Sequence, residues 1–188
     1  MNLPNKLTIL RIILAFVCIG FILHDSLSSL VIALIIFGLA SITDFFDGYI
    51  ARKKNLISDL GKILDPIADK VLIIGVFCAF LGLGIINSWI VISIMFREFT
   101  ITGLRLYSLS KGIVLEAKKI GKHKTVSQVV GIFIIFFAVI LSKTIPESVI
   151  VPFLYKKLIP LLMGYIVAIT VFSGVYYFWV NRKAIRTF

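Results

Sequence analysis

Six long runs of apolar residues dominate this chain and leave few folds open to it. Each run is close to the roughly 20 residues, with a range of about 17–25, that a helix needs to cross the hydrocarbon core of a bilayer. The runs cover about 7–23, 29–49, 65–83, 86–107, 125–142 and 157–180. Because a backbone in lipid must satisfy its own hydrogen bonds, we predict an all-α polytopic membrane protein with six transmembrane helices, in a single domain over 1–188.

Composition supports lipid as the solvent around most of the chain. Hydrophobic residues make up 60% of it, against roughly 45–50% for soluble domains. They fall in continuous runs rather than in the narrow stripes of a soluble amphipathic helix. The first run lacks a small-residue cleavage site, so we expect a retained helix and not a removed signal peptide.

Positive charge alternates between the segments that join these runs. The chain carries 20 Lys and Arg against 9 Asp and Glu, a net charge of +11. Three of the 20 basic residues, Lys143, Lys156 and Lys157, fall on one side, which leaves 17 on the other. The positive-inside rule then places both termini and the two basic connections, about 50–62 and 108–124, in the cytoplasm. We expect a multi-pass protein of the cell membrane whose charge serves orientation, anionic lipid and phosphate, with no nucleic acid partner.

Four aspartates near the second and third runs have the most informative spacing. Asp44 and Asp47 are three residues apart near the end of one predicted helix, so they share a face. Asp65 and Asp69 are four apart at the start of the next helix and also share a face. The chain reverses at the cytoplasmic side between the two pairs, which brings four carboxylates to the same depth. Asp59 is off this pattern, and we expect it to be merely solvated in the polar connector.

Four unpaired carboxylates at that depth would repel one another and lose hydration, at a cost of about a few kcal/mol each. Divalent Mg²⁺ or Mn²⁺ resolves the conflict, because hard cations take oxygen ligands and leave room for substrate phosphates. Two such ions roughly 3.5–4 Å apart stabilise the attacking and leaving oxygens of a phosphoryl displacement. Simple pairing of the aspartates with nearby Lys and Arg is the alternative, which the combined spacing disfavours.

The residues between the two aspartate pairs also fit phosphate chemistry. Gly48 permits close approach to the helix backbone, and Ala51 keeps the face of Asp44 small. Arg52 offers a planar fork to a phosphate. We expect Gly61 to allow a tight turn or a close approach ahead of the third helix.

From Asp44 to Asp69 the chain reads D-x-x-D-G-x-x-A-R-x8-G-x3-D-x3-D. This resembles, at every fixed position, the signature of the CDP-alcohol phosphotransferase family. The resemblance implies six membrane helices, usually in a homodimer, with two metals under the cytoplasmic surface. It also implies transfer of a phosphatidyl or similar phospho-group from a CDP-linked donor to an alcohol, with release of CMP.

The resemblance assigns roles to residues by their position in this signature. The implied metal ligands are Asp44, Asp47, Asp65 and Asp69. Asp69 is also the implied base that takes the proton of the acceptor hydroxyl, which agrees with the chemistry of a carboxylate beside a metal. The residues implied to face the cytidine diphosphate are Gly48, Ala51 and Arg52. The predicted binding site further includes Asn5, Thr8, Gly61 and Lys62.

Ionisable residues inside the fourth run point to the acceptor. Arg97, Glu98 and Arg105 lie where charge is costly in lipid and usually functional. Arg97 and Arg105 are eight residues apart, a little over two turns, so they fall on nearly the same face. Gly103 between them permits close packing or substrate access. With the segment G-K-H-K-T at 121–125, which opens the fifth run and contains Lys122 and Lys124, they form a predicted cationic pocket for an acceptor that carries its own phosphate. Pairing of Arg97 with Glu98 is the alternative, which we disfavour because adjacent helical residues point in different directions.

Three segments resemble the bacterial branch of this family that makes phosphatidylglycerophosphate. They are R-E-F-T-I-T-G-L-R at 97–105, G-K-H-K-T at 121–125 and the opening P-N-K-L-T-I-L-R at 4–11, with Leu3 as one departure. The resemblance extends to about residue 125. It implies CDP-diacylglycerol as the donor and sn-glycerol 3-phosphate as the acceptor.

Two other functions stay open from the sequence. The first is the same metal chemistry with another acceptor, such as phosphatidylglycerol, serine or inositol phosphate. An acceptor without a phosphate leaves the cationic pocket unexplained, whereas inositol phosphate would use a similar pocket. The second is a Mg²⁺ transporter or channel, which needs polar groups through the full thickness of the membrane. The outer halves of the predicted helices are nearly all apolar, which disfavours transport.

Overall fold

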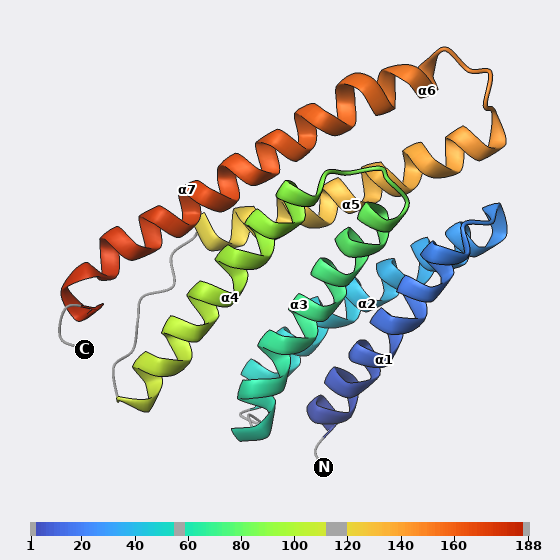
Figure 1. Cartoon of the computed structure of the whole chain (residues 1–188). Helices are drawn as coiled ribbons and strands as arrows, with labels where there is room; N and C mark the ends of the chain where they lie inside the picture. The colour runs from blue at the N-terminus through green and yellow to red at the C-terminus, as the bar shows by residue number, and fades with distance from the viewer. Residues whose placement is uncertain (1–2, 55–58, 112–119, 186–188) are drawn as a thin grey trace.

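Six long helices run side by side in the computed structural model of the chain (Figure 1). The structure describes residues 3–54, 59–111 and 120–185, and the described residues contain no strand. The long helices are α1 (Leu3–His24), α2 (Leu27–Lys54), α3 (Asp59–Gly82), α4 (Ser88–Ser110), α5 (Ile120–Thr144) and α7 (Ile159–Ile185). A short helix, α6 (Ile150–Phe153), and one π-helical turn, η1 (Leu154–Leu158), lead into α7. The all-α prediction is confirmed.

The helices extend beyond the apolar runs that predicted them. α2 continues to Lys54 rather than ending near residue 49, and α3 begins at Asp59 rather than near residue 65. Hydropathy marks only the part of a helix that suits hydrocarbon, whereas backbone hydrogen bonds continue into the polar interface. Asp59 is therefore the first residue of α3 rather than part of a connector, and its solvation stays a prediction. Gly61 lies inside the same helix, so the expected tight turn is wrong, whereas a close approach there stays a prediction.

A widened turn joins α6 to α7, where the sequence predicted no helix before about residue 157. The backbone N–H of Ile159 donates to the carbonyl of Leu154, five residues earlier. Pro160 follows at once; it has no N–H, and in a regular α-helix its ring would collide with the carbonyl four residues before it. The π-helical turn relieves this collision, so the helical path begins at Ile150 and passes through the proline.

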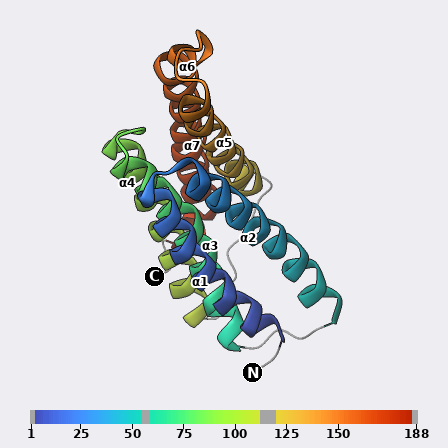
Figure 2. The ribbon, with the colours of Figure 1, turned by 90° about the vertical axis from the view of Figure 1, so that its right-hand side faces the viewer.

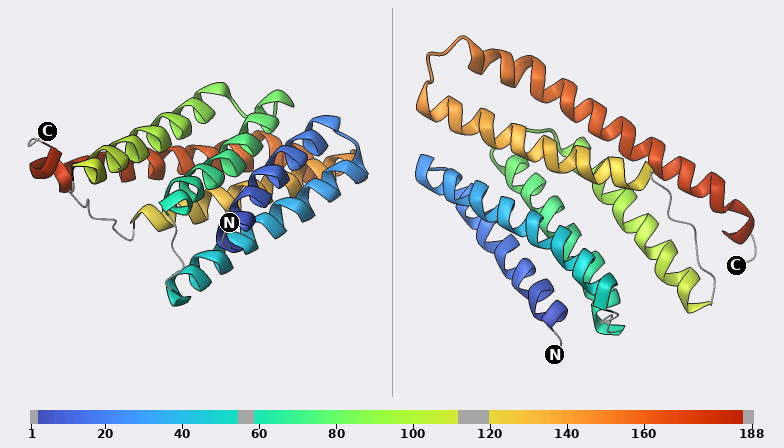
Figure 3. Two further views of the ribbon diagram at one scale, coloured as in Figure 1. Left: turned by 90° about the horizontal axis from the view of Figure 1, so that it is seen from below. Right: turned by 180° about the vertical axis from the view of Figure 1, so that it is seen from behind.

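The helices form two groups of three. α1 packs against α2 and α3, and α7 packs against α4 and α5. The groups meet where α2 and α3 contact α5 and where α3 contacts α4. Figures 2 and 3 show the long helices inclined along a common direction, with the beginning of α1 and the end of α7 toward the same end of the bundle.

Phenylalanine rings form the core where the two groups meet. Phe136 of α5 is fully buried and lies edge-on to Phe80 of α3, with 5.1 Å between ring centroids and 77° between planes. Phe37 of α2 contacts Phe133 and Phe136 of α5, with centroid distances of 5.3 and 6.1 Å. Edge-to-face pairs are attractive because a positive ring edge meets a negative ring face. The core therefore ties α2, α3 and α5 together.

The outward surface of the bundle is apolar. Phe16, Phe96 and Phe172 are 64%, 72% and 61% exposed, and apolar exposure on this scale suits lipid rather than water. Within the described residues, three helical stretches are long and apolar enough to cross a membrane, namely Leu7–His24, His123–Thr144 and Ile150–Arg182. The described apolar part of α2, Leu27–Thr43, is shorter.

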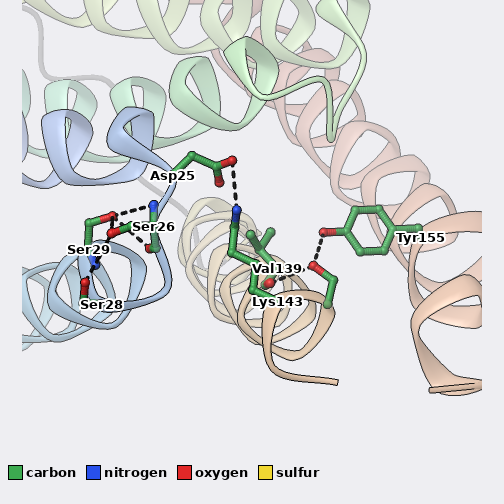
Figure 4. Close-up of polar contacts among 8 residues, drawn as sticks. Asp25, Ser26, Ser28, Ser29, Val139, Lys143 and Tyr155 are labelled. Carbon is green, nitrogen blue, oxygen red and sulfur yellow. Dashed lines mark hydrogen bonds and ion pairs between the residues drawn. The ribbon is translucent and has the colours of Figure 1, made fainter. Parts of the chain in front are cut away.

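An ion pair ties the turn between α1 and α2 to the end of α5 (Figure 4). Lys143 Nζ lies 2.9 Å from Asp25 Oδ2, and Asp25 adopts a left-handed backbone with φ of 53°. Asp tolerates this conformation better than most residues with a side chain. Figure 4 also shows Ser26 beside Ser29, whose hydroxyl accepts the Ser26 N–H at 3.0 Å at the start of α2. This end of the bundle is opposite the one where α1 begins.

We expect Phe136→Ala to lower the thermal unfolding midpoint in detergent strongly, because deleting a buried Phe side chain costs about 3–5 kcal/mol. Phe137→Ala is the matched control, since this neighbouring ring is 60% exposed and contributes little to the core. Thermal unfolding followed by intrinsic fluorescence measures both variants. Equal losses in the two would contradict the assignment of the core.

Candidate active site

A buried arginine holds the carboxylate of Asp69. Asp69 belongs to α3, and its side chain is 47% exposed. Arg11 of α1 is only 2% exposed and donates from Nη1 to Asp69 Oδ1 at 3.1 Å. Thr8, one turn earlier on α1, is also buried. A charge-assisted hydrogen bond from a buried guanidinium thus orients a carboxylate that solutes still reach.

The backbone places the other predicted metal ligands on the expected helices. α2 is continuous through Asp44 and Asp47, and α3 through Asp65 and Asp69, so each pair keeps a spacing that shares a helix face. The side chains of several predicted site residues lie outside the described part, namely Asn5, Asp44, Asp47, Gly48, Ala51, Arg52, Gly61, Lys62, Asp65 and Lys122. Convergence of the four carboxylates therefore stays a prediction.

A second group of charges lies where α4 and α5 meet. Glu98 of α4 accepts hydrogen bonds from two cations at the same oxygen, Oε1: one from Arg97 Nη1 at 3.3 Å and one from Lys124 Nζ of α5. The side chains of Arg97, Glu98 and Lys124 are 13%, 12% and 5% exposed. The shared carboxylate offsets the high cost of burying two cations. We call these three residues the Glu98 cluster.

The pair between Arg97 and Glu98 corrects our expectation that these neighbours would not pair. Adjacent residues on a helix point about 100° apart, but the Arg97 side chain is long enough to reach back to Glu98. Gly174 of α7 makes room for it, because a Cβ at Gly174 would lie 3.2 Å from Arg97 Cγ. Arg97 therefore lies against α7 while its guanidinium remains within the Glu98 cluster.

Arg105 also faces α7, as its spacing from Arg97 predicted. Its guanidinium carbon lies 5.8 Å from the ring centroid of Tyr177, a cation–π arrangement. Asn181 Nδ2 donates to the Tyr177 carbonyl at 3.0 Å, one turn along the helix. Gly103 is exposed, and a Cβ added there would meet no described atom within 4 Å. Gly103 therefore serves no close packing within the described chain.

The carboxylate of Asp69 and the cations on α4 and α5 lie within electrostatic range of one another. Lys70, next to Asp69 on α3, is close enough to Arg97 and Arg105 for their charges to repel it. Lys124 likewise interacts electrostatically with Lys70 and Asp69. In this region the described cations, Arg11, Lys70, Arg97, Arg105 and Lys124, outnumber the described anions, Asp69 and Glu98. Guanidinium and ammonium groups gathered in this way are suited to binding phosphate oxygens.

The predicted site did not include Arg11 and Lys70, whereas Lys124 stood in the segment 121–125 from which the cationic pocket was predicted. Arg11 and Lys70 stand within or at the edge of apolar runs, where an ionisable group is usually functional, and this signal could have pointed to them. Tyr177 gave no comparable signal, because aromatic residues are frequent throughout these helices.

Comparison with known proteins gives consistent matches. A family model described as CDP-alcohol phosphatidyltransferase matches residues 1–176. A protein of Bacillus subtilis (strain 168), named CDP-diacylglycerol–glycerol-3-phosphate 3-phosphatidyltransferase, is 36% identical over 99% of this chain and 98% of its own length. Proteins of the same name from Rickettsia felis and Mycoplasma genitalium are 42% and 38% identical, over 71% and 70% of this chain and 74% and 63% of their own lengths.

Glu98→Ala is expected to destabilise the fold by about 3–5 kcal/mol, because it leaves Arg97 and Lys124 buried without their shared anion. Lys143→Ala is the control. It breaks an ion pair whose side chains are 30% and 44% exposed, and such pairs contribute about 0–1 kcal/mol. Thermal unfolding in detergent compares the two variants. If Glu98→Ala unfolds no earlier than Lys143→Ala, the Glu98 cluster does not stabilise the junction of α4 and α5.

Proposed function

The chain belongs to the CDP-alcohol phosphatidyltransferase family, and on that premise we propose that it makes phosphatidylglycerophosphate. It transfers the phosphatidyl group of CDP-diacylglycerol to sn-glycerol 3-phosphate and releases CMP. A relative named for this activity matches nearly the whole chain. The observation that supports the acceptor is the group of cations beside Asp69, because a phosphate-bearing alcohol uses them and a neutral alcohol does not.

The aspartates Asp44, Asp47, Asp65 and Asp69 are proposed to hold two Mg²⁺ or Mn²⁺ ions. The donor set fits this role, since carboxylate oxygens are the preferred ligands of both cations. The described member, Asp69, has a side chain accessible enough to take a ligand. When bound, the metals supply positive charge that stabilises the diphosphate of the donor.

Asp69 is proposed to act as the base of the transfer. It takes the proton of the primary hydroxyl as that oxygen attacks the β-phosphorus of CDP-diacylglycerol. The new ester bond from oxygen to phosphorus forms while the phosphoanhydride bond breaks, and CMP leaves with the bridging oxygen. Arg11 holds Oδ1 of Asp69, so the carboxylate presents a fixed orientation to the acceptor.

The acceptor phosphate is proposed to bind between α4, α5 and α7. Arg105 and Lys122 supply positive charge there, and Arg97 supplies guanidinium N–H groups. Glu98 keeps Arg97 and Lys124 at a fixed separation, because both donate to the same oxygen. Preorganised donors of this kind need no rearrangement when the anion arrives.

We further propose that the protein is a homodimer in the cell membrane, with both termini and the active site toward the cytoplasm. The distribution of Lys and Arg supports this orientation. The exposed apolar side chains around the bundle support contact with acyl chains or with a second copy.

The proposed function is tested by CMP release from CDP-diacylglycerol in detergent with Mg²⁺, using one acceptor in each reaction. We expect turnover with sn-glycerol 3-phosphate, none with serine or phosphatidylglycerol, and loss of turnover with EDTA that added Mg²⁺ restores. Turnover with another acceptor instead would keep the metal chemistry and overturn the acceptor assignment. Folded protein inactive with every acceptor would overturn the enzymatic proposal itself.

Asp69→Asn is expected to lower kcat by roughly 10²–10⁴-fold, the usual contribution of a general base, while donor binding stays largely intact. Asp25→Asn is the control, because Asp25 follows the last residue of α1, whereas Asp69 pairs with Arg11 in the first half of that helix. Turnover is measured together with equilibrium binding of CDP-diacylglycerol. Loss of donor binding in Asp69→Asn would refute the role as base.

A further inference from the structure

Four polar atoms buried on α4, α5 and α7 have no hydrogen-bond partner among the described residues. They are Arg97 Nε, Gln128 Nε2, Thr170 Oγ1 and Tyr177 Oη. Gln128 is 1% exposed and Thr170 is fully buried. A buried polar atom without a partner costs about 1–3 kcal/mol, and native proteins leave few of them. Several on the three helices that surround one site indicate that a polar ligand completes their hydrogen bonds.

Gln128 and Thr170 lie at the same level of the seam between α5 and α7. The two helices run antiparallel (Figure 1), and Gly131 of α5 faces Ile166 of α7, where an added Cβ would lie 2.5 Å from Cδ1. One turn back along α5 reaches Gln128, and one turn onward along α7 reaches Thr170. The next turn of α5 carries Lys124, four residues from Gln128 and on the same face.

The chemistry of the seam changes from one turn to the next. The Glu98 cluster is charged, whereas one turn further into the bundle the groups are a neutral amide and neutral hydroxyls. Ser173 is also buried there, and its hydroxyl donates to the Thr170 carbonyl at 2.8 Å. Ammonium and guanidinium groups suit phosphate oxygens, whereas an amide and a hydroxyl suit an uncharged hydroxyl that both donates and accepts.

We propose that Gln128 and Thr170 form a hydroxyl site that binds the secondary hydroxyl of the acceptor. The inference rests on the proposed function. sn-Glycerol 3-phosphate presents a phosphate, a reacting primary hydroxyl and a secondary hydroxyl, and the cations and Asp69 account for the first two. Gln128 Nε2 donates a hydrogen bond to the oxygen of the secondary hydroxyl, and Thr170 Oγ1 accepts a hydrogen bond from that hydroxyl.

This hydroxyl site determines specificity. An acceptor that lacks the secondary hydroxyl leaves Gln128 and Thr170 buried without partners, and sites built to bond a hydroxyl reject such analogues strongly. The site therefore selects a phosphorylated polyol over a phosphorylated simple alcohol.

The test compares sn-glycerol 3-phosphate with 3-hydroxypropyl phosphate, which has the same phosphate and primary hydroxyl but no secondary hydroxyl. For the wild-type enzyme we expect kcat/KM to favour glycerol 3-phosphate by at least about 10²-fold. Gln128→Leu and Thr170→Val should each shrink that ratio by about tenfold or more, through loss of activity toward glycerol 3-phosphate. Thr170→Val keeps the shape of the side chain, so this variant alone is sufficient for the test if Gln128→Leu does not fold.

Two controls separate recognition from structure. Arg105→Ala should raise KM for both acceptors alike, because both carry the phosphate. Thr100→Val removes a hydroxyl that already donates to the Phe96 carbonyl at 2.6 Å, and the ratio should not change. Gln128→Leu should be at least as thermally stable as the wild type, because it removes an unsatisfied buried group.

Equal losses on both acceptors in Gln128→Leu and Thr170→Val would mean that these residues bind only ordered water or serve the fold, and would overturn the proposal. A wild-type enzyme that uses both acceptors equally would overturn it as well. Absence of any wild-type turnover with glycerol 3-phosphate is a different result, because it rejects the proposed function on which the hydroxyl site rests.

Discussion

The sharing of one carboxylate by two buried cations is the interaction on which the junction of α4 and α5 depends. Arg97 and Lys124 are costly to remove from water, and Glu98 offsets that cost by accepting from both at a single oxygen. The three side chains together keep one net positive charge, which suits the acceptor phosphate that we propose. Stability and the proposed recognition of phosphate therefore come from the same three side chains. In a bundle with an apolar outer surface, one carboxylate thus offsets the cost of burying two cations.

The two helix groups contribute different chemistry to the site. α1 and α3 bring the guanidinium of Arg11 to the carboxylate of Asp69, whereas α4, α5 and α7 bring the cations and the neutral hydrogen-bonding groups. The phenylalanine core between α2, α3 and α5 fixes one group against the other. A rigid apolar contact thus sets the relation between the side where phosphoryl chemistry is proposed and the side where the acceptor is proposed to bind.

The helices and the aspartate spacing were predictable because hydropathy and helical periodicity are local properties of a sequence. Helix ends were not, since α3 begins at Asp59 and includes Gly61, where backbone hydrogen bonds extend beyond the apolar run. The contact between Arg11 and Asp69 joins residues 58 positions apart, and no local pattern specifies it. The pairing of Arg97 with Glu98 also depends on tertiary structure, because Gly174 of another helix makes the necessary space.

The π-helical turn before α7 has a consequence for the angular phase of that helix. Leu154 and Ile159 are both buried although five residues separate them, and in a regular α-helix they would point about 140° apart. The wide turn absorbs one residue, so the helix after it is rotated relative to the helix before it. Thr170 and Tyr177 belong to the helix after the turn, and in its rotated orientation both are buried. Pro160, at the beginning of α7, thereby helps to set which face of the helix reaches the site.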